Sequence, residues 1–174
     1  MSHLKPPVGE DDHVQGPRDA RVVLVEYGDF ECQYCGEAYP ELKAVQKAMG
    51  DGLCFVFRHF PLSQAHPHAE RAAEFAEAAA TIGRFWEMHD LLYENQQALD
   101  DPSLALYADQ LGMDRKLIDA ALSGEFAARV RRDFRSGVRS GVNGTPSLFV
   151  NGERYEGARD SDTLVRAFKL VGRR

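Results

Sequence analysis

Residues 21–35 read RVVLVEYGDFECQYC, and this stretch decides the fold. Its first part, Arg21 to Tyr27, is apolar and β-branched on both faces, which is typical of a strand buried inside a sheet. The stretch closes on Cys32-Gln33-Tyr34-Cys35, a C-x-x-C pair. Over residues 36–49 the apolar residues then recur at helical spacing. We therefore expect the two cysteines between a buried strand and the start of a helix.

The remainder of the chain extends this pattern. A second buried strand is predicted at Leu53–Phe57, so the first helix is a crossover between two parallel strands. From residue 66 to about 135 only helical segments are predicted. Strand character returns at Ser147–Val150, Asn151-Gly152 is a strong hairpin signal, and a last helix follows. The sequence thus predicts an α/β fold: a mixed sheet flanked by helices, with an all-helical insertion.

Composition excludes several classes of protein. The 174 residues carry a formal net charge of -6, which argues against a nucleic-acid partner. No apolar stretch is long enough to cross a bilayer, so we expect no membrane insertion. Met1 to Gln15 are polar and lack the apolar core of a secretory signal. This favours a cytoplasmic protein, and a periplasmic one only if a leader has been removed.

Several interpretations of the cysteine pair compete. Structural zinc normally has four protein ligands, and the chain offers no second C-x-x-C; Cys54 falls in a predicted core strand. Two inert buried cysteines are a further alternative, although Glu31 and Gln33 make the surroundings of Cys32 polar. A redox pair fits best, because backbone N–H groups at a helix N-terminus stabilise a thiolate. We therefore predict no metal and no organic cofactor.

The sequence resembles the thioredoxin superfamily, and more narrowly its DsbA-like branch with a helical insertion. Glu26 lies six residues before Cys32, where the family has a buried acid, and Pro40 matches a helix-kinking proline. Gly144-Thr145-Pro146 immediately precedes a strand, as in the family's cis-proline loop. The resemblance covers about residues 14–172. It implies a thioredoxin-like domain over 14–63 and 138–174 and an inserted helical subdomain over 64–137. Residues 1–13, with Pro6, Pro7 and Gly9 among charged residues, are expected to form a flexible N-terminal arm.

The resemblance also implies roles for site residues. Cys32 is the attacking thiol, Cys35 resolves the mixed disulfide, and Glu26 relays a proton to or from Cys35. From the residues alone, Glu26 pointing to solvent or to a salt bridge is an equal alternative. Substrate is expected to contact Thr145, Pro146, Gln33 and Tyr34, with an extended peptide pairing to the Thr145 backbone.

The pattern departs from the family near Cys32. Many DsbA-like members have a proline where this chain has Gln33, so the redox poise does not carry over. Asp29 and Glu31 place negative charge near Cys32, which should raise the pKa of that thiol and offset part of the helix effect. Arg58 and His59 would counter this if they reach the site. No role is predicted for the other histidines.

The predicted function is thiol-disulfide exchange with protein or peptide substrates, together with a recycling redox partner. The direction of electron flow stays open. One alternative is a glutathione-linked isomerase or transferase of the same architecture, which the intact cysteine pair argues against. Another is a peptide-binding holdase in which the cysteines act only as a redox switch.

Overall fold

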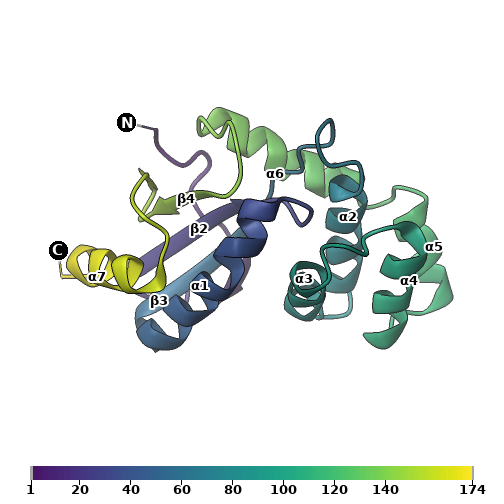
Figure 1. Ribbon diagram of the computed structural model, residues 1–174, viewed down its shortest axis with the longest axis horizontal. Helices are drawn as coiled ribbons and strands as arrows, with labels where there is room; N and C mark the ends of the chain where they lie inside the picture. The colour runs from purple at the N-terminus through teal and green to yellow at the C-terminus, as the bar shows by residue number, and fades with distance from the viewer. Residues whose placement is uncertain (1, 174) are drawn as a thin grey trace.

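A five-stranded mixed sheet forms the centre of the protein, as seen in a computed structural model that describes residues 2–173 (Figure 1). The strands lie in the order β1-β3-β2-β4-β5. Central β2 pairs in parallel with β3 and antiparallel with β4, which places Glu26 between Phe57 and Leu148. The strands are β1 (His13–Gln15), β2 (Val22–Gly28), β3 (Leu53–His59), β4 (Ser147–Val150) and β5 (Glu153–Tyr155).

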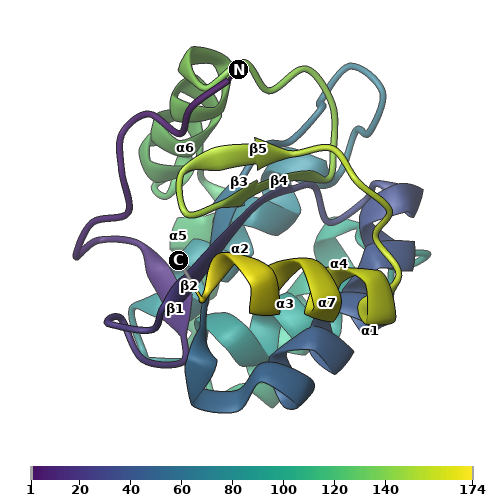
Figure 2. The same cartoon turned by 90° about the vertical axis from the view of Figure 1, so that its left-hand side faces the viewer.

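Helices cover both faces of this sheet. They are α1 (Gln33–Met49), α2 (Ala69–Ala80), α3 (Phe85–Glu94), α4 (Asp101–Gln110), α5 (Arg115–Leu122), α6 (Ala127–Arg139) and α7 (Ser161–Val171). Helices α1 and α7 pack on one face of the sheet, where Leu24, Phe55 and Leu148 point, and α7 crosses that face in Figure 2. Phe134 of α6 packs on the opposite face with Val56 and Phe149. The predicted α/β architecture is therefore confirmed.

The helical segment predicted from residue 66 to about 135 is confirmed, and it contains helices α2 to α6. These helices enclose a core of their own, rich in alanine from α2 and reaching the cysteine pair through Phe30 and Phe57. Asp114 and Asp160 cap α5 and α7, each accepting a hydrogen bond from a backbone N–H in the first helical turn. Helix α6 contacts both α2 and β3, so it joins the insertion to the sheet. The domain boundaries at residues 64 and 137 stay a prediction.

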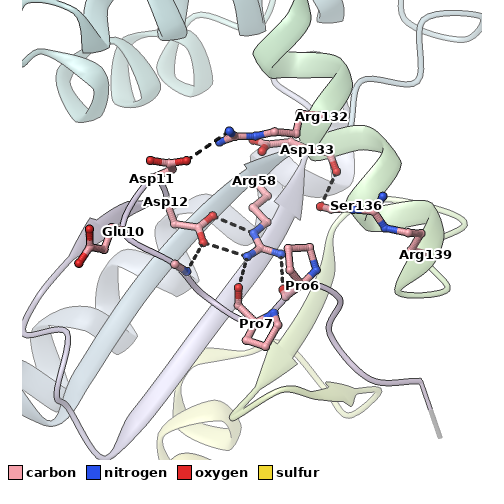
Figure 3. Close-up of a pocket in the computed structure, with 11 residues that line it drawn as sticks. Pro6, Pro7, Glu10, Asp11, Asp12, Arg58, Arg132, Asp133, Ser136 and Arg139 are labelled. Atoms are coloured by element: carbon pink, nitrogen blue, oxygen red, sulfur yellow. Dashed lines mark hydrogen bonds and ion pairs between the residues drawn. The ribbon is translucent and has the colours of Figure 1, made fainter.

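The N-terminal arm makes defined contacts with the sheet. His13–Gln15 pair antiparallel with β3 as β1, an element that the sequence analysis did not predict. Asp12 accepts two hydrogen bonds from Arg58, at 2.8 and 2.9 Å, and the carbonyls of Pro6 and Pro7 accept two more (Figure 3). Arg58 thus lies against the arm, at the wall of a cavity of about 320 Å³ between the arm and α6. The described arm residues therefore dock on the body of the protein, whereas the predicted flexibility of the arm stays a prediction.

Candidate functional site

The cysteine pair lies at the start of α1. Cys32 is the N-cap residue, and Cys35 lies in the first helical turn, so the predicted position between strand and helix is confirmed. The helix runs on through Pro40 to Met49. Both thiols are free, and the exposed fraction is 4% for Cys32 and 0% for Cys35. Cys32 is thus the more accessible of the two, by a small margin.

The two thiols differ sharply in acidity. A hydrogen bond from the Cys35 thiol is the largest cause that lowers the pKa of Cys32 to about 5, and it outweighs the opposing effect of burial. The Thr145 side chain and the backbone N–H groups of Tyr34 and Cys35 add to it. Burial, the hydrogen bond to Cys32 and the charge of Glu26 raise the pKa of Cys35 well above its ordinary value. At neutral pH, Cys32 is therefore a thiolate and Cys35 a thiol.

Nearby acids are engaged with histidines. Buried Asp29 accepts hydrogen bonds from the backbone N–H of Glu31 and of Cys32, and its second oxygen lies 2.8 Å from His66 Nδ1. Burial opposes protonation of His66, but the bond to Asp29 prevails and raises its pKa. Glu31 pairs with His68 at 3.1 Å. Asp29 and Glu31 were expected to raise the pKa of Cys32. That pKa is nevertheless lowered, so the hydrogen bonds to the Cys32 sulfur outweigh the effect of the two acids.

Arg58 and His59 do not supply the compensating charge. Arg58 is committed to Asp12, and His59 Nε2 lies 2.8 Å from a Glu77 oxygen. His13 Nε2 lies 2.7 Å from that same oxygen. Burial alone would raise the pKa of Glu77, but the hydrogen bonds from both histidines hold it below its usual range. His13, His59 and Glu77 are close enough together to hold a metal ion. The guanidinium of Arg129 lies 3.8 Å from the other Glu77 oxygen, and its positive charge disfavours a metal ion there.

Glu26 lies in the core beneath the cysteines. Its side chain points to the face of the sheet that α1 covers, and only 2% of the residue is exposed. Burial is the main cause that raises the pKa of Glu26 to about 8, and the charge of Cys32 contributes to the same effect. The Oε1 atom has no hydrogen-bond partner. Of the two interpretations of Glu26, the structure favours a buried acid over a surface salt bridge.

The expected substrate-contacting residues surround Cys32. The Thr145–Pro146 peptide bond is cis, and the Thr145 carbonyl oxygen lies 3.5 Å from the Cys32 sulfur. Tyr34 is 65% exposed beside the pair, and Gln33 donates a hydrogen bond to Glu37 on the surface of α1. A surface pocket of about 470 Å³ begins at Tyr34 and continues between α1 and residues 157–160. The structure thus brings the four residues to one edge of the site.

Two polar side chains from the insertion reach the same site, and the sequence analysis did not identify them. Gln96 donates hydrogen bonds to the carbonyls of Phe30 and Cys32, at 2.8 and 2.9 Å. Tyr93 of α3 places its hydroxyl in the core, where it has no partner. The only signal in the sequence is a pair of glycines: a Cβ atom at Gly36 would collide with Gln96, and one at Gly28 would lie 2.7 Å from the Tyr93 oxygen.

Comparison with known proteins agrees with this geometry. The sequence pattern that defines the family described as "Thioredoxin" matches residues 9–169, nearly the whole chain. The chain belongs to the thioredoxin family. Among solved structures, this thioredoxin-family chain is similar to oxidised BdbD from Bacillus subtilis, with a TM-score of 0.83 and 22% identity over 94% of each chain. It is also similar to a thioredoxin-like oxidoreductase from Silicibacter pomeroyi, with a TM-score of 0.83 and 23% identity over 95% of each.

A third solved structure of similar fold is a DsbA protein. The alpha-DsbA1 protein of Wolbachia pipientis has a TM-score of 0.82 at 13% identity, and the match covers 95% of this chain and 92% of that one. The predicted DsbA-like fold is therefore confirmed.

Curated relatives carry a different name. A segment of the Na(+)/H(+) antiporter NhaA 3 of Salinispora tropica is 45% identical over 168 residues, which is 94% of this chain and 25% of that protein. The NhaA 1 protein of Mycolicibacterium vanbaalenii is 42% identical over 174 residues, 98% of this chain and 28% of the relative. The thioredoxin-family chain thus spans about a quarter of the length of these relatives. Within residues 2–173 no helix has the length and apolar character needed to cross a membrane.

Proposed function

We propose that this protein is a thiol-disulfide oxidoreductase that exchanges disulfides with protein or peptide substrates. The observation that carries the proposal is the opposite acidity of two thiols one helical turn apart, Cys32 with a pKa of about 5 and Cys35 with a raised pKa. Disulfide exchange begins with a thiolate, and a thiol that is ionised at neutral pH is ready to attack. Thioredoxin family membership and the DsbA-like fold support the same chemistry.

The proposed reaction has two displacements. In the reducing direction, the Cys32 thiolate attacks a substrate disulfide, forms a mixed disulfide and releases one substrate thiolate. Cys35 then loses its proton to the Glu26 carboxylate and attacks the Cys32 sulfur, which releases the second substrate sulfur as a thiolate that takes up a proton. The cysteine pair ends oxidised and the substrate reduced by two electrons. The reverse sequence oxidises a dithiol.

Substrate is held beside the cis-proline loop in this proposal. An extended peptide pairs with the backbone of Thr145 and lies over Pro146, which brings its sulfur toward Cys32. Exposed Tyr34 and the pocket along residues 157–160 receive the flanking residues of the substrate. Gln33, exposed on α1 next to Cys32, is the other residue expected to contact the peptide.

Trapping of the mixed disulfide tests this division of roles. Cys35→Ser should accumulate a covalent complex between Cys32 and a disulfide-bonded substrate such as insulin, because the resolving thiol is missing. Cys32→Ser should form none, and the wild type should catalyse the reduction of insulin when dithiothreitol is supplied to reduce the cysteine pair again. Mass spectrometry of the complexes and insulin turbidity provide the two measurements. An inactive wild type in both reducing and oxidising assays would contradict the proposal and favour a holdase.

The direction of electron flow is decided by the reduction potential of the pair. A value near about -270 mV indicates a reductase, and one near about -120 mV an oxidase. We expect an oxidising poise, because a low pKa at Cys32 stabilises the reduced form. Equilibration with glutathione buffers measures this potential. A recycling redox partner and a location in the cytoplasm stay predictions, which co-purification and cell fractionation would test.

A further inference from the structure

The unpaired polar atoms of the core are concentrated around the cysteine pair. Among the described residues, five buried side-chain oxygen or nitrogen atoms lack a hydrogen-bond partner, and they include Glu26 Oε1, Thr145 Oγ1 and the Tyr93 hydroxyl. A buried polar atom without a partner costs about 1–3 kcal/mol, so each one calls for an explanation. Glu26 has one in the proposed proton transfer from Cys35, and the Thr145 hydroxyl has one because it helps to lower the pKa of Cys32. Tyr93 has none so far.

The Tyr93 hydroxyl lies on the same face of the sheet as the Glu26 carboxyl. Its oxygen occupies the place of the missing side chain of Gly28, 2.7 Å from the position of a Cβ atom there. Gly28 and Glu26 are two residues apart in β2, so their side-chain directions coincide. The hydroxyl therefore enters from α3 of the insertion toward Glu26. Cys35 belongs to the same buried cluster as Tyr93.

The ring of Tyr93 is fixed in this orientation by aromatic neighbours. Phe30 and His89 lie at centroid distances of 5.0 Å, and Tyr39 stacks at 5.4 Å. Burial and the nearby Cys35 and Glu26 raise the pKa of Tyr93 well above its ordinary value. The phenol therefore stays neutral at physiological pH and acts as a hydrogen-bond donor.

We propose that Tyr93 is a positioning residue for the proton that leaves Cys35, because its hydroxyl donates a hydrogen bond to the Glu26 carboxylate whenever that group is charged. This inference rests on the proposed function and adds a residue of the insertion to it. In the structure neither Glu26 Oε1 nor the Tyr93 hydroxyl has a hydrogen-bond partner, so each is free to pair with the other when Glu26 becomes charged. The donor stabilises the ionised carboxylate, which is the form that accepts the Cys35 proton.

Other titratable and charged groups around Glu26 come from few elements. They are Cys32 at the N-cap of α1, Cys35 of α1, Tyr93 of α3 and Arg159 of the loop before α7; Asp29, in the loop before α1, acts on Tyr93 and Cys35. The strand neighbours of Glu26 in β3 and β4 are Phe57 and Leu148, which are apolar. Tyr93 and the Cys35 thiol are thus the neutral donors of this group, and Tyr93→Phe leaves the formal charges unchanged.

A pH profile of disulfide resolution tests the inference. Reduced protein is mixed in a stopped-flow instrument with an aromatic disulfide whose thiolate product is coloured. The first colour release reports attack by Cys32, and the second reports resolution by Cys35. The rate of the second phase should rise with pH, with a midpoint that follows the ionisation of Glu26. In Tyr93→Phe this midpoint should move upward by about one pH unit, and resolution at pH 7 should slow about tenfold.

Two controls separate this role from a structural one. Tyr107→Phe removes another hydroxyl of the insertion, one that donates to the Ala98 carbonyl at 2.8 Å, and should leave the midpoint unchanged. In a Glu26→Gln background, Tyr93→Phe should cause no further change, because the carboxylate is gone. If Tyr93→Phe folds poorly, 3-fluorotyrosine at position 93 keeps the shape of the ring and, as a stronger donor, should lower the midpoint.

Results that contradict the role of Tyr93 differ from those that contradict the exchange reaction. A midpoint that Tyr93→Phe or the fluorinated ring does not move overturns the inference, and so does a slowing by Tyr93→Phe that is equal with and without the Glu26→Gln substitution. A profile that Glu26→Gln leaves unaltered overturns it as well, since Tyr93 then has no carboxylate to act on. Absence of any second colour release from the wild type would instead contradict the proposed exchange reaction itself.

Discussion

Cys32 and Cys35 have the same chemistry but different surroundings. The sulfur of Cys32 meets the N–H groups at the start of α1, the Thr145 side chain and the Cys35 thiol, which all favour negative charge. Cys35 faces Glu26 and the apolar core instead, which disfavour it. In the proposed reaction, the attacking thiol is therefore the one that faces hydrogen-bond donors, and the resolving thiol is the one that faces a carboxyl group.

The charge of Cys32 has a direct chemical readout. Alkylation of the reduced protein by iodoacetamide should proceed through the Cys32 thiolate with a midpoint at about pH 5. Cys54, which is 1% exposed, should react only after unfolding. Mass-spectrometric or stopped-flow measurement of the modification rate checks this. The range from about pH 3 to about pH 9 includes both the expected midpoint and the ordinary pKa of a cysteine thiol. A midpoint near that of an ordinary thiol would contradict the thiolate assignment, and Cys32→Ser should lack the fast reaction.

Glu26 should make stability depend on pH. Its pKa is raised from 4.5 to about 8 in the folded state, so the stability contributed by its protonated form is complete below pH 4.5 and is lost as the pH rises through 8. Glu26→Gln removes this loss. We expect the variant to gain on the order of 3 kcal/mol over the wild type at pH 7 and nothing at pH 4. Urea denaturation at the two pH values measures this difference, and an equal gain at both would refute the linkage.

The relative placement of the site residues in the thioredoxin-like part could be predicted from the sequence because their spacing is local. Glu26, Cys32 and Cys35 lie within ten positions of one another, on one strand and the helix that follows it. Tyr93 and Gln96 could not be predicted, since their relation to the site depends on how α3 packs against α1. Neither residue type is unusual in a helical segment, and a glycine at position 28 or 36 does not reveal which side chain fills its space.

At the scale of elements, hydrophobic pattern predicted the long strands and most helices. Buried β2 and β3 are apolar runs, and the capping aspartates mark two helix starts. Helix α1 begins at Gln33, earlier than the apolar spacing indicated, because its first turn follows the N-cap Cys32 and lies before the apolar repeat begins. Strand β1 was missed, since its three residues His-Val-Gln are all half-buried and have no strand pattern of their own.

The start of α1 is held by the loop after α3. Gln96→Ala removes two hydrogen bonds to the carbonyls of Phe30 and Cys32 and leaves these acceptors without that partner. We expect a loss of about 1–3 kcal/mol in unfolding free energy and a slower attack by Cys32. The neighbouring Gln97→Ala, at an exposed position, is the matched control and should change neither. Equal effects of the two substitutions in urea denaturation and alkylation assays would rule out this role for Gln96.

At the scale of the whole molecule, the N-terminal arm is fastened by a buried ion pair. Arg58 is 3% exposed, and Asp12 balances its charge through two hydrogen bonds. Asp12→Asn should destabilise the protein by about 3–5 kcal/mol, because it leaves a buried cation without its counter-charge. Asp11→Asn affects an exposed pair with Arg132 and should cost less than about 0.5 kcal/mol. Comparable losses for both variants in thermal unfolding would show that the arm is not held in this way.

Both the insertion and the sheet contribute residues to the site. Cys32, Cys35, Glu26 and Thr145 come from the sheet and its connections, whereas the insertion supplies Gln96 and Tyr93. Exchanging the insertion for that of another protein of this fold would therefore alter the surroundings of an unchanged cysteine pair. We therefore expect the redox poise to depend on the insertion as well as on the C-x-x-C motif.

The position of Cys54 has a consequence for making the protein. Its thiol lies in β3, on the opposite face of the sheet from Cys32 and Cys35. A disulfide from Cys54 to either of them is incompatible with the folded sheet, yet it forms freely in an unstructured chain exposed to air. Recovery from denaturant under oxidising conditions will thus yield trapped, scrambled chains and intermolecular dimers. Renaturation under a strong reductant, with the oxidant added only after the sheet has formed, avoids that loss.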